Sequence, residues 1–200
     1  MTDFTEIFAE HRIMAILRGF TPERTVELAT VAWNAGIELV EVPIGRPEEV
    51  ASLAATVAAG GERGKTVGAG TVITPEQVDR AAEAGARYTV APGLDTDVAV
   101  ASAAAGMPHL PGVSGATEIQ RALAVGCGWV KVFPATVVGT AWFTAMRGPF
   151  PDVQMVATGG ITVTTAPDYL AAGARVVAVG SALSDPNQVE ALRRLVALSR

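Results

Sequence analysis

The sequence predicts a (β/α)8 barrel of the TIM type with a short N-terminal helix, for three reasons. Short apolar runs of strand length alternate with Ala-rich stretches of helical length along the chain. Eight such runs can be distinguished, and regular alternation is typical of a parallel sheet built from βαβ units. The 200 residues show no linker and no shift in composition. We therefore expect a single domain over residues 1–200.

The predicted strands are apolar on both faces, as expected for strands that lie between the barrel interior and a layer of helices. Gly85, Gly106 and Gly126 each precede a predicted strand at intervals of about twenty residues, the length of one strand plus one helix. An open doubly wound sheet is the alternative, but no Gly-x-Gly-x-x-Gly motif follows the first strand. The predicted strands cover residues 13–18, 36–43, 65–71, 87–93, 108–112, 126–135, 153–160 and 175–181.

The predicted helices carry the end signals of real helices. Several have a proline in the first turn and end in a glycine. Thr21 and Thr74, together with Ser114 or Gly115, are expected to cap helix N-termini. A short amphipathic helix is expected over residues 3–11, before the first strand. The other clear helical patterns cover residues 22–35, 47–59, 75–84, 96–105 and 116–125.

Composition excludes several classes of function. The formal net charge is −5 and the charges are scattered, so a nucleic-acid partner is not expected. No apolar run has the length of a membrane span, and the acidic start lacks the features of a signal peptide. We therefore expect a cytoplasmic protein without a membrane partner. The single cysteine, Cys127, is expected to be a packed thiol, and His11 and His109 lie too far apart to indicate a metal site.

Lys131 lies in the middle of the most apolar predicted strand. The chain contains only two lysines, Lys65 and Lys131, because arginine provides the rest of its basic residues. An unpaired ammonium group is costly to bury, and lysine, unlike arginine, can lose its proton. A buried amine of this kind is suited to form a Schiff base with a carbonyl compound. The alternative is a structural lysine whose ammonium group reaches solvent at the strand end.

Glu41 is the candidate partner of Lys131. The two residues fall on the second and sixth predicted strands. Side chains from alternate strands of a (β/α)8 barrel share a layer of the interior, so both groups can face one pocket. The alternative is that Glu41 points outward and pairs with an arginine of a helix.

The active site of such a barrel lies at the carboxyl ends of its strands. Glycine-rich segments stand there after the seventh and eighth predicted strands, and these two loops form the phosphate site of many barrels. The sequence therefore favours a phosphorylated substrate. The candidate residues at the strand ends are Arg18, Glu41, Thr71, Pro92, Lys131, Phe133, Thr158, Gly159, Gly160, Gly180 and Ser181.

Several of these segments together resemble the class I aldolases that cleave 2-keto-3-deoxy-6-phosphogluconate, the galactonate epimer of that compound, or 4-hydroxy-2-oxoglutarate. The resemblance covers nearly the whole chain. It is carried by Ala-Ile-Leu-Arg-Gly at residues 15–19, Val-Glu-Val-Pro at 40–43, Gly-Ala-Gly-Thr-Val at 68–72, Ala-Pro-Gly at 91–93, Pro-Gly-Val-Ser at 111–114, Val-Lys-Val-Phe-Pro-Ala at 130–135 and Thr-Gly-Gly-Ile at 158–161.

The resemblance implies roles for most of the candidate residues. Lys131 would form the Schiff base and Glu41 would be the general acid–base. Arg18 would meet an anionic group of the substrate. Thr71 and Pro92 would lie near the pyruvoyl part of the substrate, and Thr158, Gly159, Gly160 and Ser181 would grip the phosphate at its far end.

The resemblance also implies that no metal or cofactor is needed, and that the protein is a homotrimer. One segment departs from the gluconate-type pattern, in which Thr-Leu-Arg follows Glu-Val. Here Pro43-Ile44-Gly45-Arg46 displaces the arginine by one residue. The segments around Arg18 and Glu41 lean slightly towards the galactonate type.

Two functions of other classes remain as alternatives to an aldolase that releases pyruvate and glyceraldehyde 3-phosphate. The first is a phosphosugar isomerase or epimerase that uses two carboxylates or a metal. The second is a barrel that binds a phosphorylated metabolite without catalysis.

Overall fold

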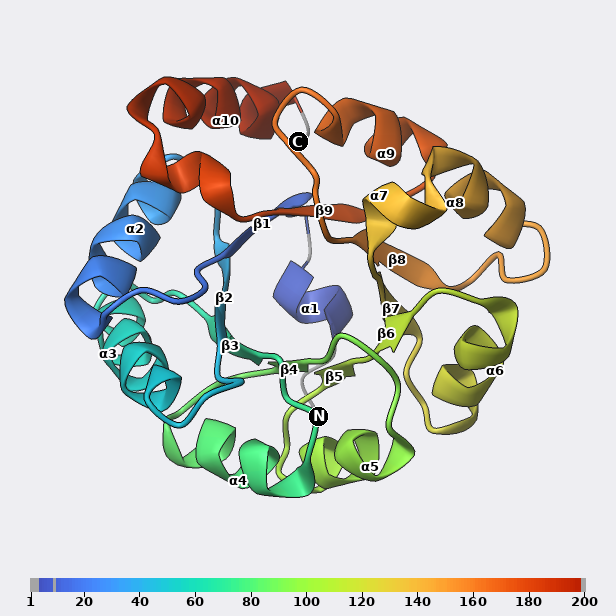
Figure 1. Ribbon diagram of the computed structural model, residues 1–200, viewed down its shortest axis with the longest axis horizontal. Helices are drawn as coiled ribbons and strands as arrows, with labels where there is room; N and C mark the ends of the chain where they lie inside the picture. The colour runs from blue at the N-terminus through green and yellow to red at the C-terminus, as the bar shows by residue number, and fades with distance from the viewer. Residues whose placement is uncertain (1–3, 9, 199–200) are drawn as a thin grey trace.

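The computed structural model is a barrel of parallel strands inside a ring of helices (Figure 1). It describes residues 4–8 and 10–198, except for the side chains of Ser181 and Pro186. The sheet has nine strands in the order β5-β4-β3-β2-β1-β9-β8-β7-β6, and every adjacent pair is parallel. The predicted barrel is confirmed. The strands are β1 (Ile13–Ile16), β2 (Leu39–Pro43), β3 (Val67–Gly70), β4 (Thr89–Val90), β5 (His109–Leu110), β6 (Gly112–Val113), β7 (Trp129–Val132), β8 (Gln154–Ala157) and β9 (Val176–Val179).

The barrel closes at Pro111. Leu110 pairs with Val90 of β4, whereas Gly112 pairs with Lys131 of β7. Proline has no N–H group to donate to a ladder, so one predicted strand over residues 108–112 is observed as two short strands on either side of Pro111. The carbonyl of Pro111 still accepts the N–H of Lys131 at 2.8 Å. This hydrogen bond joins β7, the strand that carries Lys131, to the rest of the barrel wall.

The helices confirm most of the predicted end signals. Thr21 accepts the backbone N–H of Arg24, and Thr74 forms a capping box with Gln77. Gly115, rather than Ser114, is the N-cap of its helix. One helix begins two residues later than the predicted 47–59 pattern. The helices between the strands are α2 (Pro22–Asn34), α3 (Glu49–Gly61), α4 (Pro75–Glu83), α5 (Thr96–Ala104), α6 (Ala116–Ala124), α7 (Ala135–Val138), α8 (Thr140–Met146) and α9 (Ala166–Ala172), and η1 (Ser181–Ser184) and α10 (Pro186–Leu198) follow β9.

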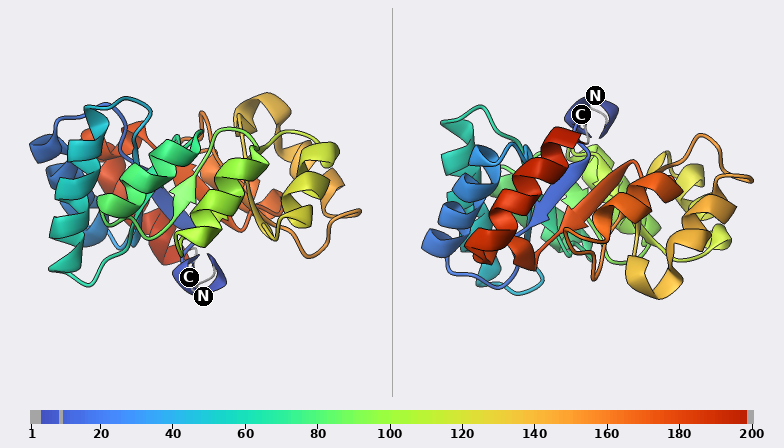
Figure 2. Two further views of the ribbon diagram at one scale, coloured as in Figure 1. Left: turned by 90° about the horizontal axis from the view of Figure 1, so that it is seen from below. Right: turned by 90° about the horizontal axis from the view of Figure 1, so that it is seen from above.

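Helix α1 (Phe4–Phe8) closes the end of the barrel at which the strands begin (Figure 2). The buried rings of Phe4 and Phe8 lie inside a cluster of barrel-interior side chains that includes Tyr88 and Trp129. Phe8 stands edge-on to Trp129, with ring centroids 4.9 Å apart. The predicted amphipathic helix is therefore present over residues 4–8, while residues 1–3 and 9 lie outside the described part of the chain. Helix α1 therefore covers the end at which the strands begin, and the carboxyl ends of the strands lie at the other end.

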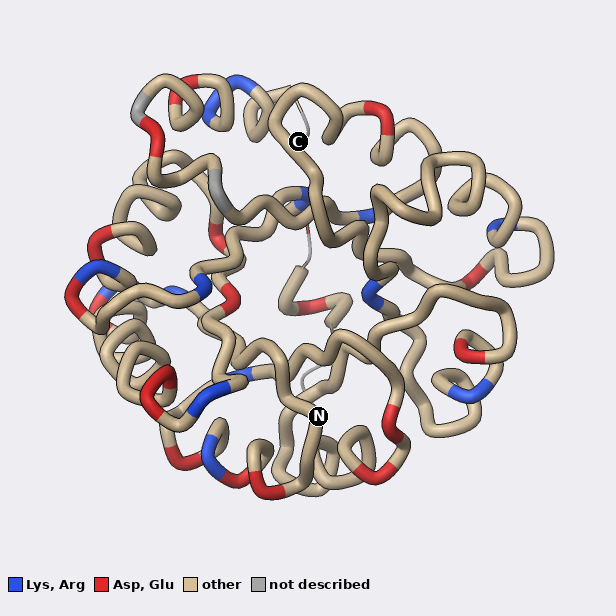
Figure 3. The backbone as a smooth tube through the Cα atoms, viewed as in Figure 1, with Lys and Arg blue, Asp and Glu red and all other residues tan. Residues whose placement is uncertain are grey.

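Two apolar layers hold the barrel together: one fills its interior, and the other lies between the strands and the ring of helices. Acidic and basic positions are scattered around the ring of helices (Figure 3), in agreement with the scattered charge of the sequence. Among the described residues, no helix is long and apolar enough to cross a membrane.

His109 is buried behind the barrel wall as a neutral imidazole. Ser102 donates to the carbonyl of Met107 at 2.9 Å, so the hydroxyl of Thr89 must donate to Ser102, and Nδ1–H of His109 must donate to Thr89. Nε2 is then an acceptor, and it has no hydrogen-bond partner among the described groups. Burial lowers the pKa of His109 to about 4, and the charge of Asp95 opposes this to a smaller extent.

This arrangement predicts a loss of stability in mild acid. The unfolded chain binds a proton at its histidine near pH 6.5, whereas folded His109 binds one only near pH 4. The stabilisation is therefore complete above pH 6.5 and declines as the pH falls towards 4. Urea unfolding at pH 7 and at pH 5 should differ by about 2 kcal/mol through this residue. In the His109→Gln variant, the difference in unfolding free energy between pH 7 and pH 5 should be smaller by about 2 kcal/mol. The same difference as in the wild type would contradict a neutral, buried His109.

Candidate active site

Lys131 and Glu41 form a buried ion pair inside the barrel. Nζ of Lys131 lies 3.8 Å from Oε1 of Glu41, and the two side chains are 3% and 0% exposed. Lys131 comes from the middle of β7 and Glu41 from the middle of β2, on opposite walls of the barrel. Neither carboxylate oxygen has a hydrogen-bond partner among the described residues. The predicted convergence of these two groups is confirmed, and the outward alternative for Glu41 is wrong.

Gly70 of β3, which has no side chain, makes room for Glu41. A Cβ atom on Gly70 would stand only 2.7 Å from Cδ of Glu41. The carboxyl group of Glu41 therefore lies across the inner face of β3, in space that any larger residue at position 70 would fill. The Gly-x-Gly sequence at residues 68–70 is thus required by packing inside the barrel, not by turn geometry.

Lys131 also stands at the wall of a cavity of about 440 Å³ at the carboxyl ends of the strands. Its ammonium group lies 5.4 Å from the ring centroid of Phe133, within the range of a cation–π contact. The cavity therefore offers a substrate direct access to an amine that is otherwise 2% exposed. Of the residues singled out in the sequence, the cavity is lined by Arg18, Lys131, Phe133, Thr158, Gly159, Gly160 and Gly180.

The cavity wall formed by β8 and β9 consists largely of backbone. Gly159 and Gly160 have φ values of 103° and 75°, which residues other than glycine rarely adopt. A Cβ atom on Gly160 would also stand 2.6 Å from Oγ1 of Thr136. Thr158, by contrast, is 3% exposed, and its hydroxyl has no hydrogen-bond partner among the described residues. The side chain of Ser181 lies outside the described part of the chain.

Arg18 is held at the mouth of the cavity by Thr71. Its guanidinium donates to Oγ1 of Thr71 at 3.0 Å, and so reaches from the end of β1 across β2 to the end of β3. Thr71 has a φ of 58°, a left-handed conformation that is rare for a β-branched residue. A Cβ atom on Gly45 would stand 3.0 Å from Cγ2 of Thr71, so Gly45 leaves the room that Thr71 occupies.

Three candidate residues do not line this cavity. Glu41 is fully buried and pairs with Lys131, Thr71 hydrogen bonds to Arg18, and the backbone of Pro92 packs closely on Gly112. The displaced arginine is also directed elsewhere, because the guanidinium of Arg46 pairs with Glu49 at 3.3 Å.

The cavity also contains residues that the sequence did not single out. Phe20 follows directly after the candidate segment at Arg18, and the hydroxyl of Ser52 donates to its carbonyl at 3.0 Å. Thr162 follows the Thr-Gly-Gly-Ile segment and hydrogen bonds to Thr164 and Thr165. Their proximity to recognised motifs was the signal that could have found them. The additional lining residues are Ile16, Phe20, Ile161, Thr162 and Ala178.

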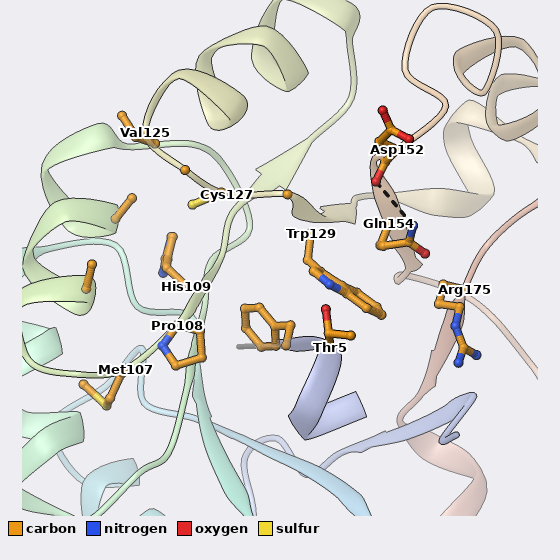
Figure 4. Close-up of a pocket in the computed structure, with 15 residues that line it drawn as sticks. Thr5, Met107, Pro108, His109, Val125, Cys127, Trp129, Asp152, Gln154 and Arg175 are labelled. Carbon is orange, nitrogen blue, oxygen red and sulfur yellow. Dashed lines mark hydrogen bonds between the residues drawn. The ribbon is translucent and has the colours of Figure 1, made fainter. Parts of the chain in front are cut away.

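A second cavity, of about 630 Å³, lies at the opposite end of the barrel beside α1 (Figure 4). It is lined by Trp129, His109 and Cys127 among others, and by none of the candidate residues from the sequence. Burial raises the pKa of the Cys127 thiol to about 11, which agrees with the expectation of an unreactive packed thiol. The smaller cavity is the candidate active site, because it is lined by Lys131, which pairs with Glu41.

Among the described residues, no group of three or more His, Cys, Asp or Glu side chains could hold a metal ion. The lining of the candidate active site also lacks a carboxylate, since Glu41 lies behind it. An isomerase that moves protons between two carboxylates would need a second acidic group at this place. The geometry is better suited to an amine nucleophile with one acid–base partner.

Comparison with known proteins agrees with this geometry. The family model "KDPG and KHG aldolase" matches residues 4–197. A probable 2-dehydro-3-deoxy-6-phosphogalactonate aldolase of Rhizobium meliloti is 36% identical over 88% of this chain and 84% of its own. A 2-dehydro-3-deoxy-phosphogluconate aldolase of Treponema pallidum is 34% identical over 94% of this chain and 89% of its own.

Solved structures show the same relation. KDPG aldolase from Legionella pneumophila, captured with pyruvate as a covalent carbinolamine intermediate, superposes with a TM-score of 0.86 at 28% identity and covers 98% of both chains. A buried amine beside a single carboxylate, a barrel closed at its other end and these similarities lead to one conclusion: the chain belongs to the KDPG and KHG aldolase family.

Proposed function

We propose that Lys131 forms the Schiff base and Glu41 moves the protons in the class I aldolase reaction of this protein. The observation that carries the proposal is the 3.8 Å separation between two buried, oppositely charged groups, one of which opens on the cavity. The substrate is a 2-keto-3-deoxy-6-phospho sugar acid of the gluconate or galactonate type. Its cleavage, like that in the family, yields pyruvate and glyceraldehyde 3-phosphate, and 4-hydroxy-2-oxoglutarate is proposed as a further substrate.

Imine formation begins when Lys131 transfers a proton to Glu41 and attacks the C2 ketone as the free amine. The separation of 3.8 Å exceeds a direct hydrogen bond, so we propose that a water molecule beside both groups relays the proton. Glu41 then returns this proton to the hydroxyl group of the carbinolamine, which leaves as water and gives the iminium ion. The ring of Phe133, 5.4 Å from Nζ, favours a cation at this position.

Cleavage follows with Glu41 as the base. Glu41 takes the proton of the C4 hydroxyl group, the C3–C4 bond breaks, and its electron pair moves into the iminium ion to give an enamine. Glyceraldehyde 3-phosphate leaves. Protonation of the enamine at C3 and hydrolysis of the imine release pyruvate and restore Lys131. The protonated imine is itself the electron sink, so the steps need no metal or cofactor.

The phosphate end of the substrate is proposed to lie against Gly159, Gly160 and Gly180. These residues present backbone without side chains at the cavity wall, and backbone N–H groups suit a phosphate. Thr158 and Ser181 are proposed to add hydroxyl donors there. At the other end, Arg18 is proposed to bind an anionic group, with Thr71 as its anchor, and Pro92 to border the pyruvoyl group.

The family relation further supports three proposals on the state of the protein. We infer that residues 1–200 form one catalytic domain, that the protein is a homotrimer and that it works in the cytoplasm with small molecules as its partners. Sedimentation equilibrium tests the assembly state, since a monomer mass would contradict the trimer.

Reduction with borohydride should trap pyruvate on Lys131. The expected result is a covalent adduct on the peptide that contains Lys131, found by mass spectrometry after digestion. The Lys131→Arg variant should form no adduct and have no activity although its charge is retained, because a guanidinium does not act as a nucleophile. Lys65→Arg is the matched control and should behave as the wild type. An adduct on Lys65 instead, or none at all, would contradict the proposal.

Replacement of Glu41 by Gln should separate proton transfer from folding. Gln has nearly the same shape but cannot accept the C4 hydroxyl proton. We expect a kcat lower by about 10²–10⁴-fold, the usual range for a lost general acid–base, with a normal circular dichroism spectrum. A Glu41→Gln enzyme with near wild-type kcat would show that another group moves the protons.

A further inference from the structure

Tyr88 lies inside the barrel close to Glu41, although it does not line the cavity. It precedes β4, is fully buried, and belongs to the cluster inside the barrel. Its ring crosses the inner face of β3, where it occupies the place that a Cβ atom on Gly68 would need. Its hydroxyl group then reaches β2 and donates to the carbonyl of Val40 at 2.9 Å. Tyr88 thus links β4 to β2 over the intervening strand.

The acceptor of this hydrogen bond belongs to the peptide unit that carries Glu41. The carbonyl of Val40 and the backbone nitrogen of Glu41 lie in one rigid plane, so the bond fixes the orientation of the backbone from which the Glu41 side chain projects. The carboxylate of Glu41 has no hydrogen-bond partner among the described groups. Its direction towards Lys131 is therefore set by its backbone and by the packing around it.

Two further contacts keep Tyr88 in place. Its ring stands edge-on to Phe4 and Phe8 of α1, with centroid distances of 5.8 and 6.2 Å. Burial, and next the negative charge of Glu41, raise the pKa of Tyr88 above its ordinary value. The phenol therefore stays protonated and remains a donor to Val40 throughout the neutral range.

We propose that Tyr88 is a positioning residue for the aldol reaction, which orients the carboxylate of Glu41 towards Lys131 through its hydrogen bond to Val40. The inference rests on the proposed role of Glu41. Gly68 and Gly70 complete the arrangement, because the first admits the ring of Tyr88 and the second admits the carboxyl group of Glu41. Loss of the hydroxyl group should slow the steps that need Glu41 and spare the binding of the keto acid.

The test compares Tyr88→Phe with Tyr169→Phe. These are the only tyrosines of the chain, and Tyr169 likewise donates from a buried position to a backbone carbonyl, that of Ala135, at 3.4 Å. Each variant keeps the ring and removes one hydroxyl group. Three experiments are made: borohydride trapping of the protein with pyruvate, exchange of pyruvate methyl protons with deuterated water, and steady-state kinetics that give kcat and KM for the phosphorylated substrate.

We expect proton exchange and kcat of Tyr88→Phe to fall roughly threefold to tenfold, the scale of one lost hydrogen bond. The fraction trapped at the endpoint, which does not depend on how fast the imine forms, and KM should stay within about twofold of the wild type, since Lys131 is untouched. Tyr169→Phe should be unchanged in all three. Exchange in Tyr88→Phe at the wild-type rate, or equal losses in both variants, would overturn the positioning role alone. A wild type that forms no adduct would instead overturn the role of Lys131, and this inference with it.

Discussion

The structure depends on one buried ion pair, between Lys131 and Glu41. Removing two charges from water costs more than their attraction returns unless their positions are well fixed. The barrel supplies this fixation by placing the two residues on opposite sides of a ring of parallel strands that closes at Pro111. In the mechanism that we propose, the same pair performs the chemistry, because an amine and a carboxylate at this distance can exchange a proton and expose a nucleophile to the cavity.

The glycines of β3 connect this pair to the packing of the barrel. Gly68 and Gly70 leave the inner face of β3 without side chains, and Tyr88 and Glu41 occupy the space from either side. Helix α1 supports Tyr88 from the closed end of the barrel. The glycines of β3, the ring of Tyr88 and helix α1 are thus parts of one packed arrangement next to the carboxylate of Glu41. The packing of the barrel interior and the geometry of the candidate site are therefore linked.

The sequence predicted the parts of this account that follow from local pattern and register. Alternating apolar and helical segments predicted the barrel, and strand counting placed Lys131 and Glu41 in one layer. The break at Pro111 was not predicted, because a proline between two short strands looks the same as a strand that ends. Tyr88 was missed for a different reason. A tyrosine in an apolar strand looks like an ordinary core residue, and its hydrogen bond to Val40 crosses the intervening strand β3. The pairing of Arg46 with Glu49 likewise depends on a loop conformation that spacing does not reveal.

The most direct test of the central claim uses the scarcity of lysine in this chain. In a Lys65→Arg protein, Lys131 is the only lysine, so ¹⁵N-labelled lysine marks a single side chain. Mixed with pyruvate labelled with ¹³C at C2, the protein should show a one-bond coupling between the two labels in its NMR spectrum. Catalytic turnover without any such coupling or its reduced amine product would contradict a covalent bond between Lys131 and the keto acid.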